Sequence, residues 1–192
     1  MLPIPWWLPA LVFGAARLAW PSRPFVSVAA YHAVCVLGLK GPFAWGRISR
    51  GDAGILAAAI AVLPLLLLLP PLPFFPGIRV TALLQGWPGG LWSWAAYSFV
   101  FNVLIEEAFW RGTILRRHGW PAWGHGAAFG LHHAVAAAIS LPWAWILPAF
   151  VATAAAGALW ARLARRRGGL GLVLLTHLGA DMAIVLLVAS QR

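Results

Sequence analysis

The residues best suited to chemistry lie in one short stretch, Asn102-Val-Leu-Ile-Glu106-Glu107-Ala-Phe-Trp-Arg111. The 192-residue chain has only four acidic residues, and two of them stand side by side here among apolar neighbours. An ionisable group at membrane depth is costly and calls for a partner or a function. On a helix, Glu107 and Arg111 share a face and are predicted to pair. Glu106 points about 100° away from Glu107, which leaves Glu106 free for chemistry.

Two further apolar segments carry polar residues that are out of place in lipid. One contains His125, His132 and His133, and the other contains Thr176, His177 and Asp181. A rise of 1.5 Å per residue places Glu106, His133 and His177 about 15, 18 and 11 Å from the same end of their segments, with Asp181 one turn beyond His177. This agreement in depth predicts one enclosed polar site.

Spacing within each segment suggests how these side chains support one another. Asp181 lies four residues after His177, so its carboxylate is expected to fix the imidazole tautomer. Asn102 lies four residues before Glu106 and is expected to hydrogen-bond it. Phe129 lies one turn from His133 and forms an aromatic wall beside that imidazole.

Composition indicates the class of protein that holds this site. The chain is 62% hydrophobic and 9% charged, with a mean hydropathy of +0.83, whereas a soluble domain is about 25% charged. We therefore predict an all-α, polytopic transmembrane bundle with a polar intramembrane cavity, formed by residues 1–192 as a single membrane domain. The net charge is +10, and the basic residues that cause it lie between the apolar runs. They do not form a stripe with interleaved aromatic residues, so nucleic acid is not an expected partner.

The length admits about seven spans of about 20 residues each. They are predicted at residues 5–20, 25–39, 55–69, 91–115, 121–139, 142–163 and 170–189; the first is short, and whether it fully crosses is left open. Residues 1–90 carry no motif, and residues 91–189 form the expected catalytic core. The loops richest in Lys and Arg, around Lys40, Arg116–Arg117 and Arg165–Arg167, are expected to be cytoplasmic.

The polar residues, taken together, resemble a known family. Glu106-Glu107-x-x-x-Arg111, Phe129-x-x-x-His133 and His177-x-x-x-Asp181 are similar, in this order, to the three motifs of the CAAX-protease and bacteriocin-processing (CPBP, or Abi) family. These proteins are intramembrane glutamic-type endopeptidases. The resemblance covers about half of the chain, and the ordered set is more specific than any single motif.

The resemblance implies a role for each residue. Glu106 would be the general base that activates water, and His133 would hold that water with it. His177 and Asp181 would stabilise the oxyanion, while Glu107 and Arg111 shape the site, with Asn102 and Phe129 in support. The cavity would open toward the cytoplasm of a multi-pass protein in a bacterial cytoplasmic membrane. Its partners would be membrane lipids and a peptide substrate, such as a peptide leader or a C-terminal sorting tail.

Two residue assignments stay open at this point. Where the family has Asn, that side chain could donate to an oxyanion, whereas an ionised Asp181 cannot. Asp181 then either stays protonated or orients His177, and we favour orientation. His132 competes with His133 because adjacent residues diverge on a helix, and the motif spacing favours His133.

Simpler readings exist for each group. Glu107 and Arg111 could form a purely structural ion pair, Glu106 could be a buried protonated acid on Asn102, and the histidines could link helices. His125 and His118 are expected at the membrane interface, and Tyr31-His32 has no assigned role.

The alternative functions are a non-enzymatic immunity or scaffold protein and a proton-coupled transporter. The chain lacks a His-Glu-x-x-His pair, so no metal and no cofactor are expected, although two His with carboxylates could bind Zn²⁺.

Overall fold

The computed structural model describes residues 4–40, 44–46, 48–49, 52, 54, 87–140 and 142–190, and all regular structure in them is helical. The predicted all-α class is confirmed. The span expected at 55–69 lies outside the described residues, so the count of seven stays a prediction. The elements are α1 (Leu8–Ala19), α2 (Pro24–Gly38), α5 (Gly90–Tyr97), η1 (Ser98–Asn102), α6 (Val103–Glu107), η2 (Ala108–Ile114), α7 (Leu115–His118), α8 (Ala122–Ser140), η3 (Trp143–Trp145), α9 (Ile146–Arg167) and α10 (Gly171–Ser190).

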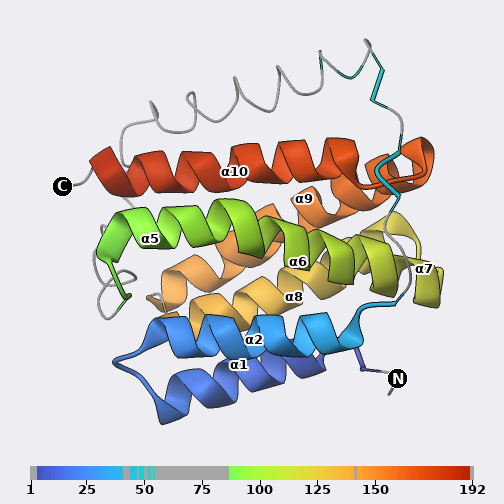
Figure 1. Cartoon of the computed structure of the whole chain (residues 1–192). Helices are drawn as coiled ribbons and strands as arrows, with labels where there is room; N and C mark the ends of the chain where they lie inside the picture. The colour runs from blue at the N-terminus through green and yellow to red at the C-terminus, as the bar shows by residue number, and fades with distance from the viewer. Residues whose placement is uncertain are drawn as a thin grey trace.

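The helical run from α5 to α7 is the central element of the bundle. It passes between α2 on one side and α10 on the other and contacts both (Figure 1). Short connections join α1 to α2, α7 to α8 and α9 to α10, so that neighbouring helices run antiparallel. The run that carries Glu106 and Glu107 is therefore enclosed by helices from both halves of the chain.

The distribution of polarity is that of a membrane protein. Large apolar side chains lie on the outside, with Trp92 74% and Trp143 85% exposed, whereas Glu107 and Arg111 are buried. In the described part of the chain, the segment Trp143–Arg167 is long and apolar enough to cross a membrane, and α1, α2 and Gly171–Met182 are shorter apolar helices. A helix as short as α1 reaches about 18 Å at 1.5 Å per residue.

Glycine allows α8 and α9 to pack closely. A Cβ atom placed on Gly126 would lie 2.4 Å from the carbonyl oxygen of Ala154, and one on Gly130 would lie 2.7 Å from the Cβ of the same alanine. Small residues four apart on one helix face permit such a backbone approach. This contact fixes the height of α8, and hence of the histidines that it carries.

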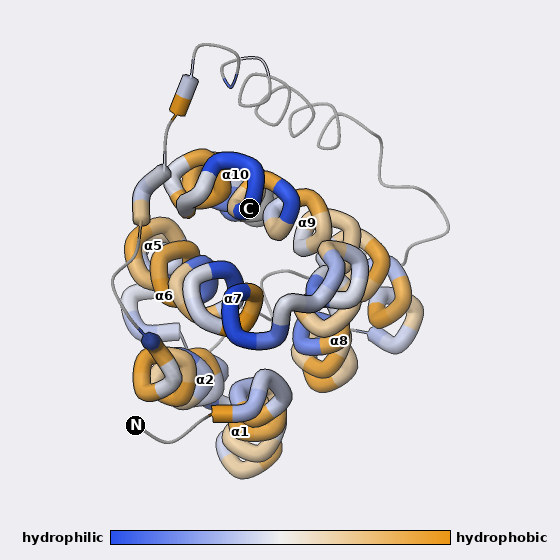
Figure 2. Tube along the Cα trace, turned by 90° about the vertical axis from the view of Figure 1, so that its right-hand side faces the viewer, coloured by the Kyte–Doolittle hydropathy of each residue, from blue (hydrophilic) through white to orange (hydrophobic). Residues whose placement is uncertain are grey.

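The basic residues gather at one end of the bundle. Figure 2 looks onto this end, where the hydrophilic tube includes α7 with Arg116 and Arg117. The α9–α10 turn is tied there to the segment after α2, since the Leu170 N–H donates to the Ala44 carbonyl at 2.9 Å. Arg17 lies at the opposite end, where α1 ends.

Asp52 fastens the end of α9. Its carboxylate accepts hydrogen bonds from the backbone N–H of Ser49 at 2.7 Å and from the Ser49 hydroxyl at 2.9 Å, and it pairs with Arg167. These hydrogen bonds, the one from the Ser49 backbone above all, lower the pKa of Asp52 below its usual value.

Candidate active site

The two glutamates occupy a single turn of α-helix between two wider π-helical segments. α6 ends with Glu106 and Glu107, η1 precedes it, and η2 follows it. π-helical turns are rare and often occur at functional sites. Residue spacing alone predicts a regular α-helix here and gives no sign of these π-helical segments.

Glu107 joins three elements of the site. Its Oε1 accepts a hydrogen bond from Nη1 of Arg111 at 2.9 Å, which confirms the predicted pair. The same oxygen lies 2.7 Å from Nδ1 of His177 on α10, so this nitrogen carries the proton and donates it. Glu107, and not Asp181, therefore orients His177 and fixes its tautomer.

The Arg111 guanidinium is enclosed by aromatic rings. Its Cζ lies 4.1 Å from the ring centroid of Phe129 and 5.0 Å from that of Trp160. Trp160 also stacks on His177, with centroids 4.3 Å apart. Rings that contact both the guanidinium and the imidazole keep water away from the pair with Glu107 and hold all three groups in place.

Glu106 has a different hydrogen-bond partner from Glu107 and approaches the other ring nitrogen of His177. Its Oε1 accepts a hydrogen bond from the Tyr31 hydroxyl on α2 at 3.0 Å. Its Oε2 is buried without a hydrogen-bond partner among the described residues and lies 3.8 Å from Nε2 of His177. That separation is too long for a hydrogen bond but lets one water molecule contact both atoms.

Asn102 and Asp181 form a second polar pair. The expected hydrogen bond from Asn102 to Glu106 is wrong, because the Asn102 amide donates to Oδ2 of Asp181 at 3.1 Å. The wider turns of η1 and the approach of α10 direct Asn102 toward the other helix. Oδ1 of Asp181 lies 3.6 Å from Nε2 of His177, within ion-pair range but beyond hydrogen-bonding distance.

The histidines of α8 divide between two environments. His133 reaches a cavity, and its Nδ1 lies 3.0 Å from the Phe129 carbonyl, so Nδ1 carries the proton and Nε2 is left to the cavity. His132 is buried and stacks on Tyr31, with centroids 4.3 Å apart. His133, the histidine that the motif spacing favours, lines the same cavity as Asp181. Neither nitrogen of His133 lies within 4.0 Å of Glu106 in the described part of the chain.

The two histidines expected at the membrane interface, His125 and His118, differ in exposure. His125 is completely buried, with its ring 5.9 Å from that of Trp110. His118 lies at the surface, where it stacks on Trp120. His125 is buried because the face of α8 that carries it turns toward Trp110 on η2. The predicted depth of the two side chains in a membrane stays a prediction.

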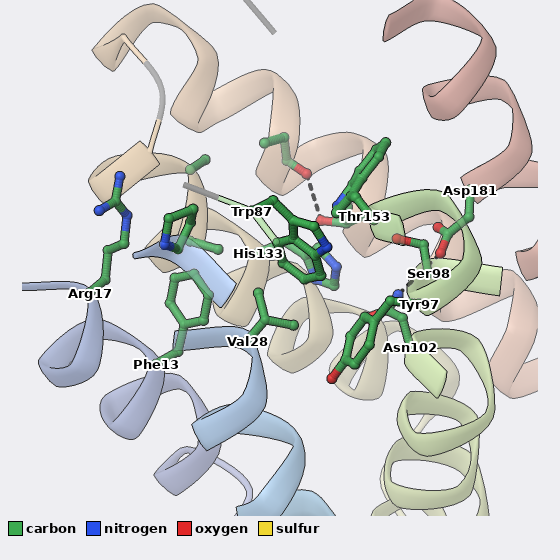
Figure 3. Close-up of a pocket in the computed structure, with 15 residues that line it drawn as sticks. Phe13, Arg17, Val28, Trp87, Tyr97, Ser98, Asn102, His133, Thr153 and Asp181 are labelled. Atoms are coloured by element: carbon green, nitrogen blue, oxygen red, sulfur yellow. Dashed lines mark hydrogen bonds between the residues drawn. The ribbon is translucent and has the colours of Figure 1, made fainter. Parts of the chain in front are cut away.

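The cavity beside the site measures about 360 Å³ and falls in the 300–1,000 Å³ range of ligand pockets. Figure 3 shows it extending from Arg17 and Phe13 to His133, Asn102 and Asp181. It thus reaches the end of the bundle opposite the basic residues. The site was expected to open toward the basic end, whereas this cavity extends toward the opposite end.

A second cavity lies at the basic end. It measures about 610 Å³, and three arginines, Arg111, Arg116 and Arg165, contribute to its wall. Arg111, in the wall of this cavity, pairs with Glu107, which in turn contacts His177. His177 lies 3.6 Å from Asp181 in the wall of the first cavity, so a chain of contacts connects the two walls. Within the described residues, no group of three or more His, Cys, Asp or Glu side chains is arranged to hold a metal ion.

Sequence reasoning missed Tyr31 and Trp110 as parts of this site. The indole N–H of Trp110 donates to the Tyr31 hydroxyl at 3.1 Å, and that hydroxyl donates to Glu106. The available signal was Tyr31-His32, a polar pair inside an apolar helix. It was left unassigned because nothing local shows which helix α2 faces.

Comparison with known proteins agrees with the motifs. Residues 88–183 match the family model described as type II CAAX prenyl endopeptidase Rce1-like. No curated protein and no solved structure matches the chain significantly. The matched segment is half of the chain and contains all three motifs together with Asn102. The chain therefore belongs to the Rce1-like family of type II CAAX prenyl endopeptidases, a family of membrane-embedded proteases.

Proposed function

We propose that this protein is an intramembrane endopeptidase in which Glu106 activates the water molecule that hydrolyses a peptide bond. One observation carries the proposal: Oε2 of Glu106 is buried, has no hydrogen-bond partner among the described residues, and faces Nε2 of His177 at 3.8 Å. A buried acceptor without a partner is costly unless water or a substrate meets it. A carboxylate and an imidazole on two sides of one water molecule form a general-base site.

Each remaining group supports this base. The Glu107 carboxylate holds His177 through Nδ1, as an orienting acid holds a catalytic imidazole. His177, once it also carries a proton on Nε2, donates toward the oxygen that becomes negative in the tetrahedral intermediate. His133 presents its Nε2 to the cavity and accepts a hydrogen bond from water there. Asp181 lies within 3.6 Å of His177 and supports the same imidazole.

The proposed reaction needs no group beyond these side chains and water. Glu106 takes a proton from water while the water oxygen forms a bond to the peptide carbonyl carbon. When the intermediate collapses, the C–N bond breaks and the proton passes from Glu106 to the leaving amine. The products are a carboxylic acid and an amine, and Glu106 returns to its starting state.

The substrate is proposed to be a membrane-associated peptide or protein, such as a C-terminal sorting tail or a peptide leader. The cavity supports this class because apolar side chains, among them Phe13 and Val28, line most of it. Its polar wall includes Asn102, His133 and Asp181, and Asp181 lies 3.6 Å from His177. The exposed apolar surface supports residence in a membrane, and we propose the cytoplasmic membrane of a bacterium. The basic end would face the cytoplasm, so the substrate would enter the first cavity from the opposite side.

The test uses the full chain in lipid vesicles and in cells. New protein termini are catalogued by mass spectrometry in cells that produce the wild type or Glu106→Gln, and the peptides identified are then cleaved in vesicles. Removing a general base costs about 10²–10⁴-fold in rate, so we expect kcat to fall at least about 100-fold. Glu107→Gln is also expected to be impaired.

Asp52→Asn is the matched control, because it neutralises an acidic residue of the basic end that does not contact the site. We expect its cleavage rate to equal that of the wild type. Equal termini in wild-type and Glu106→Gln cells would refute the hydrolytic proposal and favour a non-enzymatic peptide-binding protein.

A further inference from the structure

We infer that Tyr31, which lies outside the matched family segment, is a positioning residue that selects which oxygen of Glu106 acts as the base. The inference rests on the proposed function, and it extends the site to α2. Tyr31 is 3% exposed, and its hydroxyl lies 3.0 Å from Oε1 of Glu106. The family match begins at residue 88, so the motifs alone do not describe the whole site.

The direction of the hydrogen bonds follows from the donor chemistry of the chain. The Trp110 indole N–H can only donate, and it donates to the Tyr31 hydroxyl oxygen at 3.1 Å. That oxygen is thereby an acceptor toward Trp110, so its own proton points to Oε1 of Glu106. The chain of donors runs from Trp110 through Tyr31 to Glu106, and each member polarises the next.

This chain makes the two oxygens of Glu106 unequal. Oε1 is occupied by the Tyr31 proton, whereas Oε2 has no partner among the described residues and faces His177. Only Oε2 is then free to accept a proton from water. Without the Tyr31 hydroxyl, the Glu106 carboxylate could rotate about χ3, because the distribution of such sp³–sp² torsion angles is broad. Either oxygen could then face His177.

Packing keeps the Tyr31 ring in place. Its face stacks on the ring of His132, with an interplanar angle of 15° and centroids 4.3 Å apart. His132 and His133 are neighbours on α8 but point in different directions: His132 packs against Tyr31, and His133 lines the cavity. The buried imidazole of His132, otherwise unexplained, thus acts on Glu106 through Tyr31.

Tyr31→Phe tests the inference because it removes the hydroxyl and keeps the ring on His132. We expect kcat to fall about 10-fold or more, as for a lost hydrogen bond to a charged group. KM should stay unchanged, since Tyr31 does not line the cavity. Ser27→Ala is the matched control: it removes another buried hydroxyl of α2, one with no hydrogen-bond partner among the described residues. It should leave kcat, KM and thermal unfolding unchanged.

A second readout separates this inference from the proposed function. The infrared band of the Glu106 carboxyl group is assigned by its absence in Glu106→Gln, and we expect it to shift in Tyr31→Phe. Trp110→Phe, which keeps a ring in place, should shift it less. A band that does not move overturns the inference, and so does a band that moves while kcat is unchanged. If Glu106→Gln cleaves normally, the proposed function falls, whereas the infrared result still reports on the bond between Tyr31 and Glu106.

Discussion

The buried pair of Glu107 and Arg111 allows the sharpest quantitative prediction. Both side chains are fully inaccessible, and their contact is 2.9 Å long. Nε and Nη2 of Arg111 have no hydrogen-bond partner among the described residues. The Glu107 carboxylate therefore provides most of the electrostatic stabilisation that offsets the burial of the Arg111 charge. Breaking a buried pair by removing one partner costs about 3–5 kcal/mol, because the other charge is left alone.

We therefore expect Glu107→Gln and Arg111→Met each to lower the free energy of unfolding by about 3–5 kcal/mol. The double variant should lose less than either single one, since no lone charge remains in it. What it loses is the charged acceptor for Nδ1 of His177, at about 1–3 kcal/mol. With midpoint losses of about 4 kcal/mol for each single variant and about 2 kcal/mol for the double variant, the coupling energy of the cycle would be about 6 kcal/mol in magnitude.

The measurement is reversible unfolding of the four proteins in mixed micelles or bicelles, followed by a signal from the buried tryptophans. Trp160 contacts both Arg111 and His177 and reports on this region directly. The reasoning is refuted if the loss in the double variant equals the sum of the two single losses, because the charges would then be stabilised independently of each other.

Two further predictions concern the supporting structure. Gly130→Ala would place a Cβ 2.7 Å from that of Ala154, and overpacking of this kind costs about 1–3 kcal/mol. Thermal unfolding should detect this loss of stability. Gly124→Ala is the control: its Cβ would lie 3.7 Å from the nearest atom, so its stability should equal that of the wild type. The lowered pKa of Asp52 stabilises the fold above the usual carboxyl pKa near 4, and this stabilisation is lost as the pH falls through the lowered folded value. Unfolding below about pH 4 should depend on pH less steeply in Asp52→Asn than in the wild type.

The sequence predicted those features of the site that depend on one helix alone. Glu107 and Arg111 pair because residues four apart share a helix face in any bundle. The predicted depths place Glu106 and His177 at similar levels because the rise of a helix per residue is nearly constant. In the structure the two side chains lie 3.8 Å apart. The helices predicted for the described residues also hold, with ends that differ by a few residues.

What the sequence did not predict depends on the rotation of one helix against another. The expected partner of His177 was Asp181 on its own helix, yet Glu107 on the central run is closer, at 2.7 Å against 3.6 Å. The π-helical segments on either side of α6 change the direction of the side chains by an amount that spacing cannot give. Tyr31 comes from a helix without any motif, and only its packing against the central run shows its role.

The aspartate at the end of the third motif, Asp181, is best understood together with the helix that faces it. An asparagine at that position would bring an amide N–H to the cavity, and Asp181 brings only acceptors when it is ionised. The structure places the Asn102 amide 3.1 Å from Asp181, and both residues line the cavity beside His133. The amide that position 181 lacks is thus present on the neighbouring helix, where it donates a hydrogen bond to the Asp181 carboxylate. The two positions form one polar unit, so the role of Asp181 can be judged only together with Asn102.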